Sequence, residues 1–158
     1  MEVHDKVENF SLQNQDEQTV QLNEFAGKPI VLFFYPKADT PGCTIEACGF
    51  RDTFSELENA GAVVLGISRD TPRAQKKFQQ KYNLAYPLLA DVNGEACKQF
   101  DVLREKNMYG KKVIGIERTT FLIGPDLRLL KIFPKVKPEG HAEEVLKIIR
   151  EYAKAHPA

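Results

Sequence analysis

The sequence predicts an α/β fold in which helices flank a central mixed β-sheet and a β-hairpin is added at the N-terminus. Two continuous apolar runs, residues 30–35 and 62–68, have the composition of strands buried on both faces. Stretches of helical periodicity follow these runs, so strands and helices alternate along the middle of the chain. Two further apolar runs joined by a turn lie near the C-terminal end and bring antiparallel strands into the sheet.

The N-terminal segment has the pattern of a hairpin followed by a short turn. Residues 9–13 and 18–22 each alternate apolar with polar side chains, and the polar stretch 14–17 separates them. This arrangement predicts two strands joined by a tight connection. Asn23 is suited to cap one short helical turn that ends at Gly27.

The predicted sheet is centred on the strand of residues 30–35. Pro36 ends this strand because proline has no N–H group to give to a central ladder. A short loop with a turn at Pro41-Gly42 comes next. Apolar positions at roughly helical spacing then predict a helix from about residue 44 to residue 59.

Shorter strands and helices alternate along the rest of the chain. They are a helix that starts at Asp70-Thr71-Pro72, a strand at 87–90, a helix that contains Cys97, hairpin strands at 115–123 and 127–133, and a last helix over 141–152. The polar residues 104–113 are expected to form a surface loop. No repeat or linker divides the chain, so residues 1–158 are expected to form one domain. A mixed sheet with this order of elements resembles a thioredoxin-like fold.

Composition and charge exclude several classes of function. Lys+Arg and Asp+Glu each number 22, so the net charge is zero and no basic excess points to nucleic acid. No stretch approaches the ~20 apolar residues of a membrane span, and the N-terminus lacks the apolar core of a signal peptide. Three cysteines do not suggest a secreted disulfide scaffold, so a reducing, cytoplasmic compartment is expected. The histidines stand far apart in polar contexts, so no metal or other cofactor is expected.

Cys43 is the predicted nucleophile. It lies between the central strand and the following helix, among unpaired backbone N–H groups and the positive end of the helix dipole. These features favour the thiolate, which is the reactive form of cysteine. The alternative is a small buried apolar residue, and Cys97, on a short amphipathic stretch, fits that alternative better.

Three further residues complete a candidate site around Cys43. The Thr40 hydroxyl can both donate and accept, so it can hold a reacting oxygen while bonding the thiolate. Pro36 shields the loop and removes a competing donor. Arg118 is a charge within an otherwise apolar strand and can stabilise both the thiolate and a leaving oxygen. The alternative for Arg118 is a sheet-edge arginine paired with Glu117 or Asp39.

These residues match the signature of a known family. The segment 36–43, Pro-Lys-Ala-Asp-Thr-Pro-Gly-Cys, resembles the Pro-x-x-x-Thr/Ser-x-x-Cys motif of peroxiredoxins, and 33–48 is similar to their bacterioferritin-comigratory, or Q-type, branch. Similar blocks at 65–70, 105–110 and 115–121 extend the resemblance over nearly the whole chain. It implies a thiol peroxidase that acts on hydrogen peroxide and organic hydroperoxides. Cys43 would be its peroxidatic cysteine, with Thr40, Pro36 and Arg118 completing the site, and Glu46 would help to position the arginine or the opening of the site.

Cys48 is the predicted resolving cysteine. On one intact helix, a separation of five residues puts the two Cα atoms roughly 8 to 9 Å apart. A disulfide cannot bridge more than ~7 Å without backbone movement, so the first helical turns must unwind before the bond can form. Peroxide would leave a sulfenic acid on Cys43, and Cys48 would then condense with it.

The Q-type resemblance also implies this intramolecular resolution, with thioredoxin or a similar dithiol protein as reductant. An internal disulfide needs no partner subunit, so a monomer is expected. Three alternatives stay open at this point. Cys48 could be a buried helix residue, Cys97 could be the resolving cysteine, or the thiols could be incidental to a binding protein of the same fold.

Overall fold

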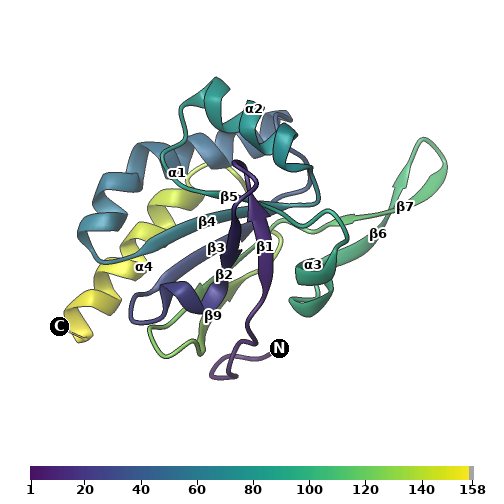
Figure 1. Cartoon of the computed structure of the whole chain (residues 1–158). Helices are drawn as coiled ribbons and strands as arrows, with labels where there is room; N and C mark the ends of the chain where they lie inside the picture. Colours follow the sequence, from purple (N-terminus) through teal and green to yellow (C-terminus); the bar gives the residue numbers. More distant parts are fainter. Residues whose placement is uncertain (157–158) are drawn as a thin grey trace.

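The computed structural model describes residues 1–156, and Figure 1 shows the order of the elements along the chain. The strands are β1 (Ser11–Asn14), β2 (Thr19–Gln21), β3 (Ile30–Phe34), β4 (Val63–Ser68), β5 (Leu88–Ala90), β6 (Leu103–Met108), β7 (Lys111–Ile116), β8 (Thr119–Ile123) and β9 (Leu129–Phe133). The α-helices are α1 (Pro41–Asn59), α2 (Pro72–Tyr82), α3 (Glu95–Gln99) and α4 (His141–Ala155), and a 3-10 turn, η1, spans Leu22–Phe25. None of the described helices combines the length and the apolar character needed to cross a membrane.

A seven-stranded mixed sheet lies at the centre of the fold, with strand order β2-β1-β5-β4-β3-β8-β9. Strands β3, β4 and β5 are parallel, while β8 runs antiparallel to β3 and β9 antiparallel to β8. The N-terminal hairpin β1–β2 extends the far edge because β1 pairs antiparallel with β5. The predicted mixed sheet with an added hairpin is therefore confirmed.

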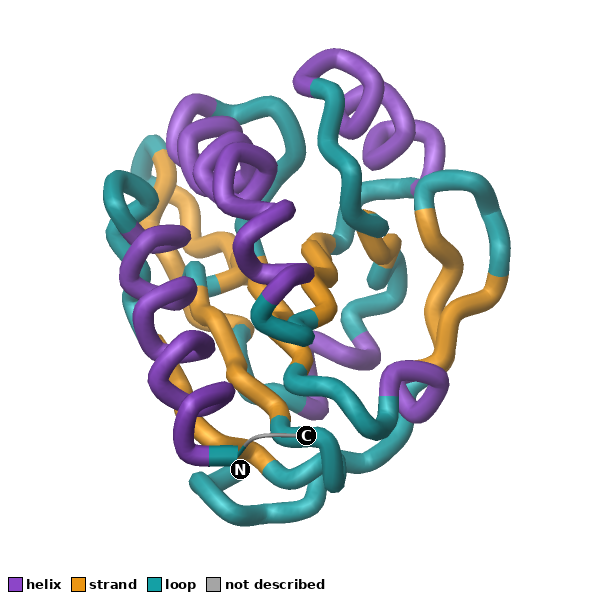
Figure 2. Tube along the Cα trace, turned by 90° about the vertical axis from the view of Figure 1, so that its left-hand side faces the viewer, coloured by secondary structure: helices purple, strands orange, loops and turns teal. Residues whose placement is uncertain are grey.

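Strand β3 divides the apolar interior into two halves, since its successive side chains point to opposite faces of the sheet. Val31, Phe33 and Tyr35 pack with α1, α2 and α4 on one face. Ile30, Leu32 and Phe34 pack with α3 and the N-terminal segment on the other. Every residue of β3 is buried, as the continuous apolar run predicted. Figure 2 shows the helices as purple coils against the orange strands.

Helix α1 is fixed to the sheet and to α4 by aromatic packing. The rings of Phe33 and Phe50 stack with their centroids 4.7 Å apart, and His141 meets Phe50 edge-on at 5.8 Å. Phe50 is completely buried, so the middle of α1 cannot move without opening the interior. The first turns of α1 lie before this fixed point.

The expected surface loop over residues 104–113 is wrong. The segment is part of a two-stranded ribbon, β6–β7, which extends away from the main sheet (Figure 1). Tyr109 and Gly110 both have positive φ angles, of 53° and 77°, and connect strands that pair Met108 with Lys111. A two-residue connection of this kind matches strand twist well. Because most of the ribbon is exposed, its side chains do not alternate in polarity, and the polar sequence resembles a loop.

The prediction of one continuous strand over 115–123 is also wrong. Strand β7 ends at Ile116 and β8 begins at Thr119, so Glu117 and Arg118 lie outside both strands. At this interruption the Arg118 carbonyl accepts a hydrogen bond from the Val136 amide instead of from a sheet neighbour. Leaving the sheet allows Arg118 to point toward the start of α1.

Helix α1 begins earlier than the sequence predicted, at Pro41 instead of about Thr44. Proline is well suited to the first position of a helix, because the N–H group that it lacks has no intrahelical acceptor there. Thr40 is the N-terminal capping position, and Cys43 is consequently the third residue of the helix.

Candidate active site

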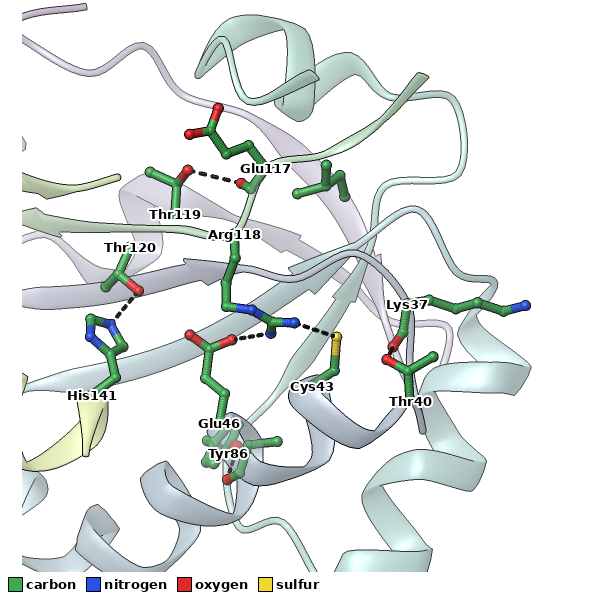
Figure 3. Close-up of polar contacts among 12 residues, drawn as sticks. Lys37, Thr40, Cys43, Glu46, Tyr86, Glu117, Arg118, Thr119, Thr120 and His141 are labelled. Carbon is green, nitrogen blue, oxygen red and sulfur yellow. Dashed lines mark hydrogen bonds and ion pairs between the residues drawn. The ribbon is translucent and has the colours of Figure 1, made fainter. Parts of the chain in front are cut away.

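The candidate site forms where β3 ends, α1 begins and residues 117–118 connect β7 to β8 (Figure 3). Cys43 is only 1% exposed, and Arg118 reaches it from the opposite side of the site. The Nη2 atom of Arg118 lies 3.4 Å from the Cys43 sulfur, within hydrogen-bond distance for sulfur. The positive charge of the guanidinium therefore faces the buried sulfur directly.

Glu46 holds the other side of the Arg118 guanidinium. Its Oε1 atom accepts a hydrogen bond of 2.9 Å from Nη1, and the carboxylate is 1% exposed while the guanidinium is 15% exposed. Burial raises the pKa of Glu46 to about 7, although Arg118 acts in the opposite direction. The second carboxylate oxygen has no hydrogen-bond partner among the described residues. Arg118 is therefore shared between a buried carboxylate and the sulfur.

The alternative partners of Arg118 are engaged elsewhere. Glu117 binds Arg104 at 2.9 Å, and Asp39 binds Lys81 at 2.9 Å and the Tyr82 hydroxyl at 2.7 Å. The expected alternative of a sheet-edge arginine paired with Glu117 or Asp39 is therefore wrong. The structure pairs Arg118 with Glu46, which the sequence had suggested only as an auxiliary residue.

Thr40 and Pro36 lie on the loop that leads into α1, and Thr40 directly precedes the first helical residue. The Thr40 hydroxyl donates to the Lys37 carbonyl at 2.7 Å and makes no capping bond to α1 (Figure 3). In the described chain no hydrogen bond joins this hydroxyl to Cys43, so the expected bond to the sulfur is not formed here. Pro36 is half-buried and lines the same cavity as Arg118.

The loop of residues 36–40 is fixed at two points. The Ala38 amide donates to Asp70 at 2.8 Å, and Asp70 also accepts a hydrogen bond from the Ser68 hydroxyl. Asp39, in a left-handed conformation with φ 60°, is held by the end of α2. These contacts fix the approach to Cys43 before the helix begins.

Gly42 is a site residue that sequence reasoning missed. A Cβ atom at this position would lie 3.0 Å from Nη2 of Arg118 and 3.5 Å from Pro138. Glycine thus leaves the space in which the guanidinium lies against the helix. Only the fold reveals this role, because the two residues are far apart in sequence.

Cys48 lies on the same continuous helix as Cys43 and is half-buried, and both thiols are free. Burial raises the pKa of the Cys48 thiol. Cys97 is buried on the opposite face of the sheet, among the side chains of α3, so its predicted packing role agrees with its position. In the described part of the chain, no group of His, Cys, Asp and Glu side chains is arranged to hold a metal ion.

The chain is similar to known proteins over most of its length. Residues 3–132 match the model of the AhpC/TSA family. A putative peroxiredoxin bcp from Coxiella burnetii is 49% identical over 92% of this chain and 97% of its own length.

Solved structures are similar over the same extent. The bacterioferritin comigratory protein of Xanthomonas campestris superposes with a TM-score of 0.87 at 41% identity, covering 91% of this chain and 92% of its own. A cysteine-to-serine variant of PrxQ from Xylella fastidiosa gives a TM-score of 0.92 at 39% identity, covering 97% and 98%. These relatives confirm the thioredoxin-like fold. The chain belongs to the AhpC/TSA family and, within it, to the Bcp/PrxQ peroxiredoxins, which are peroxidases.

Proposed function

We propose that this peroxidase reduces hydrogen peroxide and organic hydroperoxides through a sulfenic acid on Cys43. The main support is the 3.4 Å contact between the Arg118 guanidinium and the buried sulfur. The bacterioferritin comigratory protein of X. campestris has alkyl peroxide reduction activity, which supports the organic substrates. Residues 1–158 act as one domain in this proposal.

The first step is attack of the Cys43 thiolate on the terminal peroxide oxygen. The S–O bond forms as the O–O bond breaks, and the electron pair of that bond goes to the leaving oxygen, which takes up a proton and departs as water or an alcohol. Arg118 stabilises the charge that develops on the leaving oxygen. Because the Thr40 hydroxyl donates to the Lys37 carbonyl, its oxygen is left to accept a hydrogen bond from the peroxide O–H group. Pro36 shields the thiolate from water.

The second step joins Cys43 to Cys48. The two cysteines lie on one intact helix, so the first turns of α1 must unwind before the sulfurs can meet. Burial raises the pKa of Cys48 in the folded helix, and unwinding removes that effect. The Cys48 thiolate then attacks the sulfenic acid sulfur, the S–O bond breaks, and the oxygen leaves as water.

Recycling needs two electrons from a dithiol. Thioredoxin or a related protein reduces the disulfide back to two thiols and becomes oxidised to its own disulfide. The proposed disulfide is internal and needs no partner subunit, so the proposal includes a monomer, and its need for a dithiol reductant fits a reducing compartment such as the cytoplasm.

One experiment tests both steps. The reduced protein is treated with one equivalent of hydrogen peroxide, and its intact mass and peptides are measured. The expected product is lighter by two hydrogens and contains a Cys43–Cys48 peptide. The Cys48→Ser variant should gain one oxygen instead, and Cys43→Ser should not change. A peptide that joins Cys43 to Cys97 would show that the resolving residue is wrong.

A further inference from the structure

A cavity of about 600 Å³ opens beside the catalytic residues. It shares Pro36 and Arg118 with the active site, and its other walls come from β6 and from the segment after β9. Arg104, Lys106 and Lys135 contribute most of its charge, and Glu117 is the one carboxylate among its lining residues. The cavity therefore brings several cations next to the guanidinium that contacts the Cys43 sulfur.

The balance of charge in this cavity is positive because its carboxylate is already neutralised. Glu117 binds the Arg104 guanidinium at 2.9 Å. The Lys106 ammonium donates to the Ile116 carbonyl at 2.9 Å, which uses one of its three N–H groups. Within residues 1–156, neither Lys106 nor Lys135 forms an ion pair. Two cations thus remain uncompensated.

The fold holds both lysines close to the catalytic arginine. Lys106 crosses to β7, where a Cβ added to Gly115 would lie 3.5 Å from its side chain. Lys135 precedes Val136, whose amide donates to the Arg118 carbonyl at 2.9 Å. The two segments that carry the lysines therefore adjoin the residue that contacts the Cys43 sulfur.

We propose that Lys106 and Lys135 form a subsite for the carboxylate of an anionic organic hydroperoxide. The peroxide end of such a substrate reaches Cys43, its carbon chain lies against Pro36 and Val136, and its carboxylate lies between the two ammonium groups. This inference rests on the proposed function. A hydroperoxide group is itself uncharged near neutral pH, so the lysines act on the distant end of the substrate and set its specificity.

A matched pair of substrates tests the subsite. A tertiary alkyl hydroperoxide with a terminal carboxylate is compared with its methyl ester, and the second-order rate constant for Cys43 oxidation is measured at low and high salt. The wild type is expected to prefer the acid by about 5-fold at low salt, since two partly exposed cations each add a modest attraction. Salt should reduce this preference because it screens exposed charges.

Variants assign the preference to particular lysines. Lys106→Gln/Lys135→Gln should oxidise the acid and the ester at similar rates and keep the wild-type rate with the ester. Lys137→Gln changes the net charge by one, lies two residues from Lys135 and does not line the cavity. It should keep the preference.

Two results would overturn the subsite. One is equal rates for acid and ester in the wild type, and the other is a preference that survives in the double variant. If Cys43 reacts with neither compound nor with hydrogen peroxide, the proposed function itself fails. Binding then provides a separate readout. The alcohol that corresponds to the acid should shift the amide NMR signals of Lys106 and Lys135, and its methyl ester should not, whereas equal or absent shifts would reject the subsite.

Discussion

Cys43 and Cys97 occupy similar positions in two different helices. Each is the third residue of its helix, α1 or α3, and their exposed fractions are 1% and 0%. Both follow a connection from a strand of the central sheet. By burial and by position near a helix N-terminus, the two thiols are nearly equivalent.

The groups that face them are opposite in charge. Arg118 contacts Cys43, whereas the Asp91 carboxylate accepts hydrogen bonds from the Cys97 amide at 2.8 Å and the Ala96 amide at 3.1 Å. Burial, together with Asp91, raises the pKa of the Cys97 thiol. No side chain caps α1, so its first-turn N–H groups stay available to an anion. Burial and a position near a helix N-terminus therefore do not distinguish the proposed nucleophile from Cys97. We infer that the charge opposite the sulfur does.

Replacing Cys43 or Cys97 with serine should give the largest difference in peroxidase turnover between the two positions. Cys43→Ser is expected to lose peroxidase turnover by about 1,000-fold or more, because the hydroxyl is a much weaker nucleophile than a thiolate. Cys97→Ser should keep the wild-type rate and lose some stability, because it puts a hydroxyl into an apolar cluster. Turnover with a dithiol reductant and urea denaturation measure the two effects. A slow Cys97→Ser enzyme of normal stability would contradict the comparison.

Removing the cation that acts on each sulfur should give the next largest difference between Cys43 and Cys97. Arg118→Met is expected to slow Cys43 oxidation by about 100-fold, a typical effect of losing one charge-stabilising group. Arg69 is the cation that acts on Cys97, and Arg69→Met is the matched control. Its rate should stay within about 2-fold of the wild type. Stopped-flow measurement of single-turnover oxidation checks both, and equal losses in the two variants would point to a general effect of charge.

The Glu46→Gln variant tests the buried Glu46–Arg118 pair through the pH dependence of stability. The pKa of Glu46 is about 7 in the folded chain, against an ordinary value of 4.5, so between these values the folded state binds more protons than the unfolded state. The stability that this carboxyl contributes is complete below pH 4.5 and is lost as pH rises through 7.

Relative to Glu46→Gln, the wild type should therefore lose about 1–3 kcal/mol of unfolding free energy over this range. Urea denaturation at several pH values measures the difference. Glu58→Gln, which changes an exposed carboxylate on the same helix, should follow the wild type. A constant difference between Glu46→Gln and the wild type would show that Glu46 does not titrate in this range.

Asp91→Ala tests the Cys97 side of the comparison. The variant leaves the Ala96 and Cys97 amides without their acceptor, so it should lower the unfolding free energy by about 2 kcal/mol. Asp91→Asn keeps one acceptor oxygen and should recover part of the loss. Thermal denaturation measures both, while peroxidase turnover should be unchanged. A clear fall in turnover at wild-type stability would connect Cys97 to the reaction.

Gly42→Ala should give the smallest effect and sharpen the role of Arg118. The new Cβ would lie 3.0 Å from Nη2, so the guanidinium must shift by a few tenths of an ångström. Oxidation of Cys43 is expected to slow by about 3-fold because the charge moves away from the sulfur. Alanine favours a helix over glycine, so stability should not fall. Gly49→Ala, which adds a Cβ 3.3 Å from Ala142 and far from the guanidinium, is the control. An unchanged rate in Gly42→Ala would mean that the arginine tolerates displacement.

The sequence predicted the parts of the site that are contiguous along the chain. Residues 36–43 form one motif, so the nucleophile and its loop could be recognised from residue types and order. Arg118 lies far along the sequence. It was predicted because it is a charge within an apolar run, and the family resemblance strengthened that prediction. Its partner was uncertain because Glu46, Glu117 and Asp39 were all plausible until the chain path was known. Gly42 was missed because its neighbour is distant in sequence.

The fold was predictable where burial leaves a clear apolar pattern in the sequence, either a continuous apolar run or one apolar face of a helix. Strand β3 and helix α4 carry strong apolar patterns, and both are present. The β6–β7 ribbon has little buried surface, so no periodicity marks its strands. The start of α1 was misplaced because Pro41 suits both a turn and the first position of a helix.

The stacking of Phe50 on Phe33 has a consequence for the durability of the enzyme. Phe50 is completely buried two residues beyond Cys48, and removing such a ring from the core costs about 3–5 kcal/mol of stability. In the proposed cycle, the unwinding of α1 would therefore end just past Cys48. The buried residues of α1 beyond Cys48 then stay packed, which limits the apolar surface that each cycle would expose to other chains.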